Sequence, residues 1–223
     1  MSPTSYQTAP PRVASITVPE GPGSAPAGVL LLRDDGDAVG EKEGGRFVDI
    51  IDRYEEATTG FTARLDVVTD DQWTNPTPCV DWTVRQLVDH VIDVQRAIPE
   101  GLGMTIADGA DPQATWKAIR EGAMAVLRRP GVLEKTLPGR SGEVPVEMSV
   151  GIRMGDLLVH TWDLARATGG DERLDAETAA LVLERLRPND EVLRNTGTFG
   201  PKIDPPAGAD ASIELLCFTG RRP

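Results

Sequence analysis

The sequence predicts an all-α (mainly helical) protein: a bundle of four amphipathic helices with a short β-hairpin and an N-terminal extension. Three observations predict this class. Apolar residues recur at intervals of three and four in several long segments after residue 46. Helix-capping residues stand at the ends of those segments. One pair of short extended runs, between residues 132 and 148, flanks the turn sequence PGRSG and predicts a hairpin.

The first 45 residues differ in composition from the rest of the chain. The segments PEGPGSAPAG and DDGDAVGEKEGG are rich in glycine, proline and acidic residues, which build little hydrophobic core. Two short apolar runs in the first 45 residues, VASITV and GVLLLR, are candidate edge strands. We therefore expect an extension over residues 1–45 and one folded domain over residues 46–223.

One helix is expected before the proline-containing segment DDQWTNPTPCVDW and a second helix after it. Thr83, followed three residues later by Gln86, has the spacing of a capping box and predicts the start of the second helix. The helical period of the first begins near residue 46, and its apolar face carries Phe47, Ile50, Ile51, Tyr54, Phe61, Leu65 and Val68. The apolar stripe of the second comprises Val84, Leu87, Val88, Val91 and Ile98.

Three further helices follow. The third is predicted to begin at Asp111, an N-cap residue followed by a proline, and to end before Pro130. The fourth is predicted over residues 149–168, where a pair of glycines ends it. The fifth has the sequence AETAALVLERLR and stops at Pro188; the tail carries one more apolar run, IELLCF.

Composition limits the partners of the protein. The formal net charge is −12, whereas nucleic acids and anionic membranes need a basic face, so we expect neither as a partner. The first residues lack the pattern of a secretory signal, and no stretch approaches the ~20 apolar residues of a membrane span. Two cysteines without a CxxC motif fit a reducing compartment. A cytoplasmic protein that acts on a small molecule is therefore expected.

Three titratable groups follow one another along the predicted fourth helix: Asp156, His160 and Asp163. A rotation of ~100° per residue places all three within a narrow arc. Ile152 and Val159, with Ala167, lie in or beside this arc, so we expect it to face the interior of the bundle. Charged groups are costly to bury, which indicates a specific role for the three.

A metal site is one such role. His90, Asp156 and His160 form a set of two imidazoles and one carboxylate, and catalytic zinc commonly has three protein ligands and one open position. Asp163 is then a candidate to orient a ligand histidine through its second ring nitrogen. Arg153, one turn before Asp156, is a candidate to pair with that carboxylate or with an anionic substrate. Nickel, iron and manganese also bind such ligands.

A purely structural interpretation remains open from spacing alone. A histidine on a helix is more often a satisfied core or boundary residue than a ligand, and Asp163 and Arg166 have the spacing of an ordinary helix pair. Cys79 precedes a helix start, where a reactive thiol is conceivable, but a small buried turn residue is the more frequent case. The four tryptophans are expected in the core rather than around a ligand.

Two histidine motifs resemble a known group of proteins. NPTPCVDWTVRQLVDHV and DLLVHTWDLARATG, with the tail FGPKIDPPAGADASIELLCFTGRRP, resemble the DinB-like superfamily, in the branch typified by the N-terminal domain of mycothiol-dependent maleylpyruvate isomerase. The likeness covers residues 46–223. It implies a four-helix bundle that holds a divalent metal, usually zinc, through His90, Asp156 and His160. Isomerase-type members carry glutamate at the position of Asp156, so this chain has a shorter carboxylate there.

The resemblance also implies chemistry. Related members are thiol S-transferases, in which the metal binds and deprotonates a low-molecular-weight thiol such as mycothiol or bacillithiol. We therefore expect a metal-dependent thiol S-transferase or a thiol-assisted isomerase acting on a small electrophile. The chain has little room for the extra C-terminal domain of the isomerases, which argues against maleylpyruvate itself as substrate. The alternatives are a non-catalytic metal-binding module and a metal-free bundle that binds a small molecule, for instance a cyclase in a biosynthetic pathway.

Overall fold

The computed structural model describes residues 50–139, 142–195 and 199–223. The predicted extension with its two candidate strands, and the start of the first predicted helix, lie outside these residues. The elements in chain order are α1 (Ile50–Leu65), η1 (Gln72–Thr74), α2 (Val84–Gly101), α3 (Pro112–Leu127), β1 (Thr136–Gly139), β2 (Gly142–Pro145), α4 (Val146–Thr168), α5 (Ala176–Leu186), η2 (Arg187–Asn189), α6 (Asp190–Asn195) and α7 (Ala211–Phe218).

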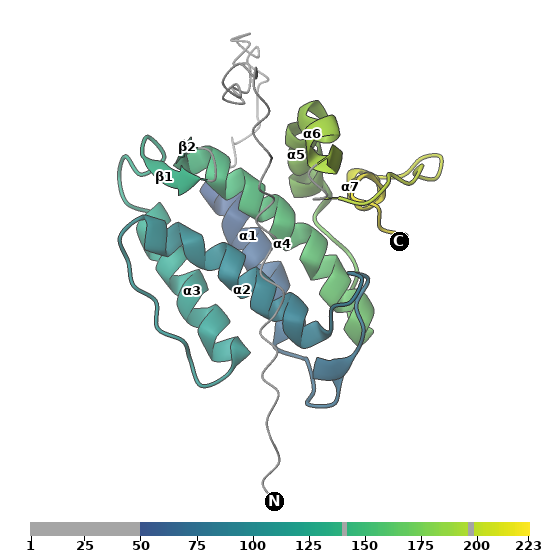
Figure 1. Cartoon of the computed structure of the whole chain (residues 1–223), viewed down its shortest axis with the longest axis horizontal. Coiled ribbons are helices and arrows are strands. Elements are labelled where there is room, and N and C mark those ends of the chain that lie inside the picture. Colours follow the sequence, from purple (N-terminus) through teal and green to yellow (C-terminus); the bar gives the residue numbers. More distant parts are fainter. Residues whose placement is uncertain (1–49, 140–141, 196–198) are drawn as a thin grey trace, which may run out of the picture. The chain divides into compact units, whose positions relative to one another are not determined.

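The four long helices form a bundle, which confirms the predicted all-α class. Helix α1 packs against α3 and α4, and α2 packs against α3 and α4. Helix α5 packs on α4 and also against α7, so the last three helices lie beside the bundle on the α4 side (Figure 1). None of the helices in the described ranges combines the length and the apolar character that a membrane span requires.

The predicted helix ends are confirmed where a capping residue marks them. The side chain of Thr83 accepts a hydrogen bond from the backbone of Gln86, whose side chain accepts one from the backbone of Thr83, so the capping box fixes the start of α2. The Asp111 carboxylate accepts a bond of 2.7 Å from the backbone N–H of Ala114 at the start of α3. Gly169 ends α4 with a φ of 71°, a conformation that costs glycine little.

The hairpin is confirmed as a two-stranded antiparallel sheet of β1 and β2, which leads directly into α4. That helix starts at Val146, three residues before the predicted start, because the strand runs straight into it. Pro188 does not stop the helical region after α5. It occupies the first turn of η2, where a proline needs no hydrogen-bond partner for its nitrogen, and the short helix α6 follows.

The buried core of the bundle follows the predicted apolar faces of α1 and α2. Tyr54, Phe61, Leu87 and Val91 are fully buried. The exception is on α4, where Ile152 is 59% exposed although the sequence predicted it to face inward. The opposite face of this helix is the buried one there, since Val150, Met154 and Leu157 have no exposed surface. Because most of α4 is enclosed by α1, α2 and α5, polar residues on it lie inside the protein.

Candidate metal centre

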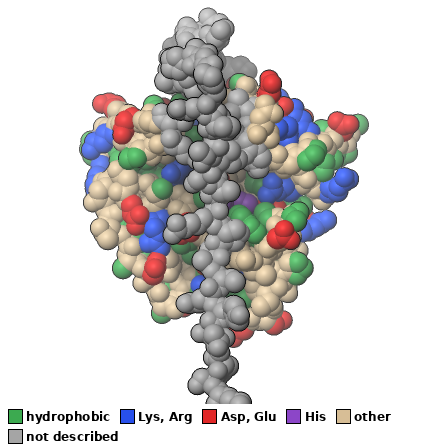
Figure 2. Space-filling view, viewed as in Figure 1, with side chains coloured by type: hydrophobic (Ala, Val, Ile, Leu, Met, Phe, Trp, Pro, Cys, Tyr) green, Lys and Arg blue, Asp and Glu red, His purple; other side chains and the backbone are tan. Residues whose placement is uncertain are grey.

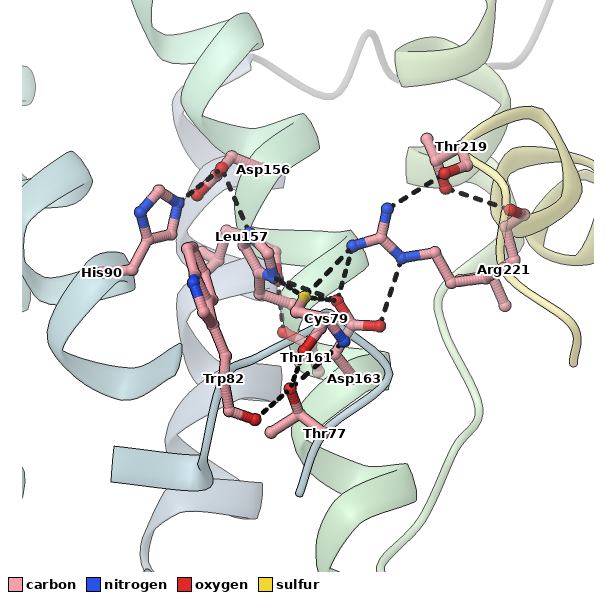
Figure 3. Close-up of polar contacts among 12 residues, drawn as sticks. Thr77, Cys79, Trp82, His90, Asp156, Leu157, Thr161, Asp163, Thr219 and Arg221 are labelled. Carbon is pink, nitrogen blue, oxygen red and sulfur yellow. Dashed lines mark hydrogen bonds and ion pairs between the residues drawn. The ribbon is translucent and has the colours of Figure 1, made fainter. Parts of the chain in front are cut away.

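His90 and His160 meet the carboxylate of Asp156 between helices α2 and α4. The Oδ1 atom of Asp156 lies 3.3 Å from Nε2 of His90 and 3.5 Å from Nε2 of His160. One ligand atom from each of the three residues lies within 4.8 Å of the other two. Figure 3 shows His90 reaching from its own helix toward Asp156. The structure therefore brings together the three residues that the sequence predicts as ligands.

The donor set fits a tetrahedral divalent ion. Zinc bonded to nitrogen and oxygen at about 2.1 Å places neighbouring donor atoms about 3.4 Å apart, close to the two measured separations. The second carboxylate oxygen of Asp156, Oδ2, is buried and has no hydrogen-bond partner among the described residues. A buried acceptor without a partner is costly, and a cation at this place would satisfy it. The aspartate reaches both imidazoles despite being one methylene shorter than glutamate.

Charge complementarity holds the cluster together. Burial by itself would raise the pKa of Asp156, but His160 and His90 outweigh it and hold that pKa well below its ordinary value. Burial likewise opposes the charged form of His160, yet Asp156, Asp163 and Cys79 raise the pKa of this imidazole well above its ordinary value. The two carboxylates beside His160 therefore stabilise a positive charge at this place.

Asp163 supports His160 from the other side of the ring. Its Oδ2 atom lies 3.0 Å from Nδ1 of His160, and its side chain has no exposed surface. Arg221, from the segment after α7, donates to both carboxylate oxygens of Asp163, at 3.2 and 2.8 Å. Asp163 does not form the alternative helix pair with Arg166, which bonds to Glu172 instead. A carboxylate at Nδ1 fixes the ring so that Nε2 is left to accept, as a metal ligand requires.

Cys79 and Trp82, both from the segment before α2, also contact the site. The Cys79 thiol donates to Oδ2 of Asp163 at 3.2 Å, and its sulfur lies 3.8 Å from Nδ1 of His160. The ring centroid of Trp82 lies 4.7 Å from that of His90 and 5.9 Å from that of His160. The expectation that the tryptophans belong to the core is therefore incomplete, since Trp82 forms a wall of the site.

Sequence reasoning missed Arg221 and gave Cys79 no role at the site. Arg221 is 58 residues from its partner Asp163, and Cys79 is 84 residues from it. Contacts between such distant segments leave no periodic pattern in the sequence. The only local signal was the resemblance of the tail, in which Arg221 stands, to the tails of related proteins.

Arg153 lies behind the ligand set rather than on it. It forms no ion pair with Asp156 among the described residues, and its Nε atom is buried without a partner. Burial lowers the pKa of Arg153, while the charges of Tyr54 and Asp156 oppose that shift. Its carbonyl oxygen accepts a hydrogen bond of 3.0 Å from Gln95, which links α4 to α2 one turn from the site.

A second group of donors shares His160 with the first. Cys79, His160 and Asp163 each present one atom within 4.8 Å of the other two. The guanidinium of Arg221 already occupies this place as a cation, because its NH2 atom lies 2.8 Å from Asp163 and 3.5 Å from the Cys79 sulfur. In the ranges that the structure describes, no lysine or arginine forms an ion pair with the first group, which is therefore the better candidate for a metal ion.

Two of the three ligand side chains, those of His90 and Asp156, are partly exposed to solvent. The side chains of His90 and Asp156 are 20% and 25% exposed, whereas that of His160 is 10% exposed. Figure 2 shows a histidine side chain at the surface beside apolar and basic side chains. A small molecule can thus approach the ligand set from the side of His90 and Asp156.

Comparison with known proteins identifies the family of the chain. The family model of the mycothiol maleylpyruvate isomerase N-terminal domain matches residues 54–129, the part that contains His90. The uncharacterized proteins MT0763 and Rv0738, from two strains of Mycobacterium tuberculosis, are each 34% identical to the chain over 142 residues, which is 62% of this chain and 76% of theirs. No solved structure matches. The chain therefore belongs to the family of the mycothiol maleylpyruvate isomerase N-terminal domain, within the DinB-like superfamily.

Proposed function

We propose that this protein is a metal-dependent S-transferase, or thiol-assisted isomerase, that uses a low-molecular-weight thiol of the mycothiol type and acts on a small electrophilic molecule. The observation that supports it is the meeting of the two imidazoles of His90 and His160 at Oδ1 of Asp156, whose second oxygen, Oδ2, is buried without a partner among the described residues. The family of the chain is mycothiol-related, which supports the choice of thiol.

The three side chains would hold a divalent ion, and two imidazoles with one carboxylate are a ligand set that suits zinc. Such an ion supplies the charge that converts a coordinated thiol into a thiolate near neutral pH. Two neutral imidazoles and one carboxylate contribute a single negative charge, so a divalent ion would keep a net positive charge. Asp163 would accept a hydrogen bond from the Nδ1–H group of His160, which leaves Nε2 of that ring free to bind the ion.

Among the described residues, no side chain at the site is arranged as a nucleophile for the transfer. Cys79 is the thiol nearest to the site, but its sulfur faces Nδ1 of His160, the nitrogen that also faces Asp163. His160 therefore cannot serve Cys79 as a free general base in the way a cysteine–histidine pair requires. In the proposed reaction the nucleophile is the sulfur of the low-molecular-weight thiol itself.

Trp82 and the partly exposed edge of the site would position the substrates. The indole packs on both imidazoles and keeps water from that side of the ligand set. Exclusion of water strengthens the attraction between a thiolate and nearby positive charge. Carbon electrophiles with an apolar body, such as enones and epoxides, match such a wall better than highly charged molecules do.

The proposal is tested with the full chain reconstituted with zinc. Mycothiol, bacillithiol and N-acetylcysteine are each supplied with an electrophile such as monobromobimane, and loss of the thiol is followed with and without protein. The proposal predicts faster loss with wild type and with Asp89→Asn, which removes a carboxylate from a surface ion pair with Arg85. It predicts the uncatalysed rate with Asp156→Asn. If the protein retains zinc but accelerates the loss of thiol with none of the thiol–electrophile pairs, a non-catalytic metal-binding module would be supported instead.

A further inference from the structure

A pocket of about 440 Å³ lies beside Cys79, on the side of His160 opposite to the ligand set. It is bounded by the turn before α2, by α4, and by the segment after α7. Its lining includes Pro78, Cys79, Val80, Trp162, Arg166 and Arg222. Figure 3 shows Arg221 entering this region from the C-terminal segment toward Cys79.

The charge of this pocket is opposite to that of the protein. Three arginines, at positions 166, 221 and 222, line it, and no acidic residue of the described chain does, although the whole chain carries a net charge of −12. Arg221 is paired with Asp163 and Arg166 with Glu172, whereas Arg222 forms no ion pair with any residue in the described ranges. The pocket therefore holds one uncompensated positive charge beside two guanidinium groups with further N–H donors.

The rest of the lining includes the apolar side chains of Pro78 and Val80. The Trp162 ring beneath them is 3% exposed and is covered by the guanidinium of Arg166, 5.4 Å from its centroid, which holds that arginine in place. Val80 is 84% exposed, an unusual position for a large apolar side chain. Planar guanidinium groups match the two oxygens of a carboxylate, and the apolar walls match a hydrocarbon body.

We propose that this pocket binds a small organic carboxylate, with the anionic group at Arg222 and Arg166 and the apolar body against Pro78 and Val80. The site is distinct from the proposed metal centre. It does not depend on the thiol chemistry proposed above, because its ligand is held by arginines and needs neither metal nor turnover.

The thiol of Cys79 lines the pocket, so its rate of alkylation can report on the charge of the pocket. Iodoacetate and iodoacetamide both alkylate a thiolate: the sulfur–carbon bond forms, the carbon–iodine bond breaks, and iodide leaves. They differ in charge, so the ratio of their rates at Cys79 reports the electrostatics of the pocket, and the fraction of thiolate cancels in the ratio. Alkylation is carried out on the folded chain, in which Cys217 is 2% exposed, and mass spectrometry of the digested product measures the modification at Cys79.

The expected iodoacetate-to-iodoacetamide ratio at Cys79 exceeds that of N-acetylcysteine by about threefold or more, which is the order of one charge pair in water weakened by salt. Arg222→Ala should return the ratio toward the reference. Arg129→Ala, which removes an exposed charge at the end of α3, should leave it unchanged. A ratio equal to the reference, a ratio that Arg222→Ala does not change, or a Cys79 that neither reagent reaches would overturn the proposal.

Protection by ligands tests the organic part of the proposal. Benzoate should slow the alkylation of Cys79 by iodoacetamide in wild type and not in Arg222→Ala. Benzamide has the same shape without the charge and should give no protection. Phosphate has the charge without the apolar body; protection by phosphate equal to that by benzoate would contradict an organic ligand.

Discussion

The carboxylate of Asp163 lies 3.0 Å from the Nδ1 atom of His160, in a position with no exposed surface. The same carboxylate receives two hydrogen bonds from Arg221 at the end of the chain. Its own position is therefore fixed by a segment outside the four-helix bundle. The C-terminal segment thus reaches the ligand set through two successive contacts.

Replacing Asp163 by asparagine should weaken zinc binding. Loss of the carboxylate that orients a ligand histidine typically reduces metal affinity by about tenfold to a hundredfold. The affinity is measured by competition with a chelating dye on protein whose circular dichroism shows it to be folded. Asp89→Asn serves as the matched control. An unchanged affinity in folded Asp163→Asn would remove this residue from the site.

At position 156 the charge should matter more than the length of the side chain. Asp156→Glu should keep zinc bound, because isomerase-type members of the resembled branch carry glutamate there. Asp156→Asn removes the only carboxylate of the ligand set and should lose binding by a larger factor than Asp163→Asn. The same dye competition measures both variants. Equal loss in Asp156→Glu and Asp156→Asn would show that the geometry, not the charge, is limiting.

Tyr54 and Gln95 form a buried hydrogen bond of 2.9 Å between α1 and α2. Tyr54→Phe keeps the ring and leaves the oxygen of Gln95 without this donor, which should lower the free energy of unfolding by about 1–3 kcal/mol. Urea unfolding followed by circular dichroism measures the change. Zinc affinity should stay the same, since in the described ranges Gln95 bonds to Tyr54 and to the backbone of Arg153 but not to a side chain of the ligand set. A loss of zinc without a loss of stability would contradict this division.

Asp175 should stabilise the start of α5 in a pH-dependent way. Burial acts to raise its pKa, but bonds from Thr178 and the charge of Arg53 lower it below the ordinary value. A carboxyl group with a depressed folded-state pKa stabilises the protein above its unfolded-state pKa of about 3.9, and this contribution is lost as the pH falls through the folded-state value. Asp175→Ala should cost about 0.5–2 kcal/mol at pH 7, as loss of an N-cap does.

Urea unfolding of wild type and Asp175→Ala at pH 7 and at pH 3.5 checks this expectation, with the exposed Asp204→Ala as control. The difference between wild type and Asp175→Ala should shrink at the lower pH. A difference that is the same at both values would show that the cap acts without its charge.

Local signals account for the part of the structure that the sequence predicted. Thr83 and Gln86 are three residues apart, and their capping box fixes the start of α2 whatever the rest of the chain does. The helical period of α4 placed Asp156 and His160 on one face of that helix, whereas the approach of His90 from α2 is a contact between helices that the period alone does not give. The inward direction predicted for Ile152 was wrong because α5 packs on another face of α4, and spacing within one helix cannot reveal that neighbour.

The rest of the site depends on contacts between distant segments. Cys79 and Arg221 are 142 residues apart and touch only because α5 and α7 return the tail to the bundle. Nothing in the residues near Cys79 indicates a buried arginine beside it. The pocket lined by three arginines also forms where the C-terminal segment meets the bundle, so the sequence could not predict it.

The most direct test of the metal centre is the zinc content of the full-length protein. Wild type and His90→Ala are reconstituted with excess zinc, desalted, and analysed by inductively coupled plasma mass spectrometry against protein concentration. The metal-site proposal predicts about one equivalent in wild type and little retained metal in the variant, which has lost one of three ligands. Wild type that retains no divalent metal, or a His90→Ala variant that retains as much as wild type, would contradict it.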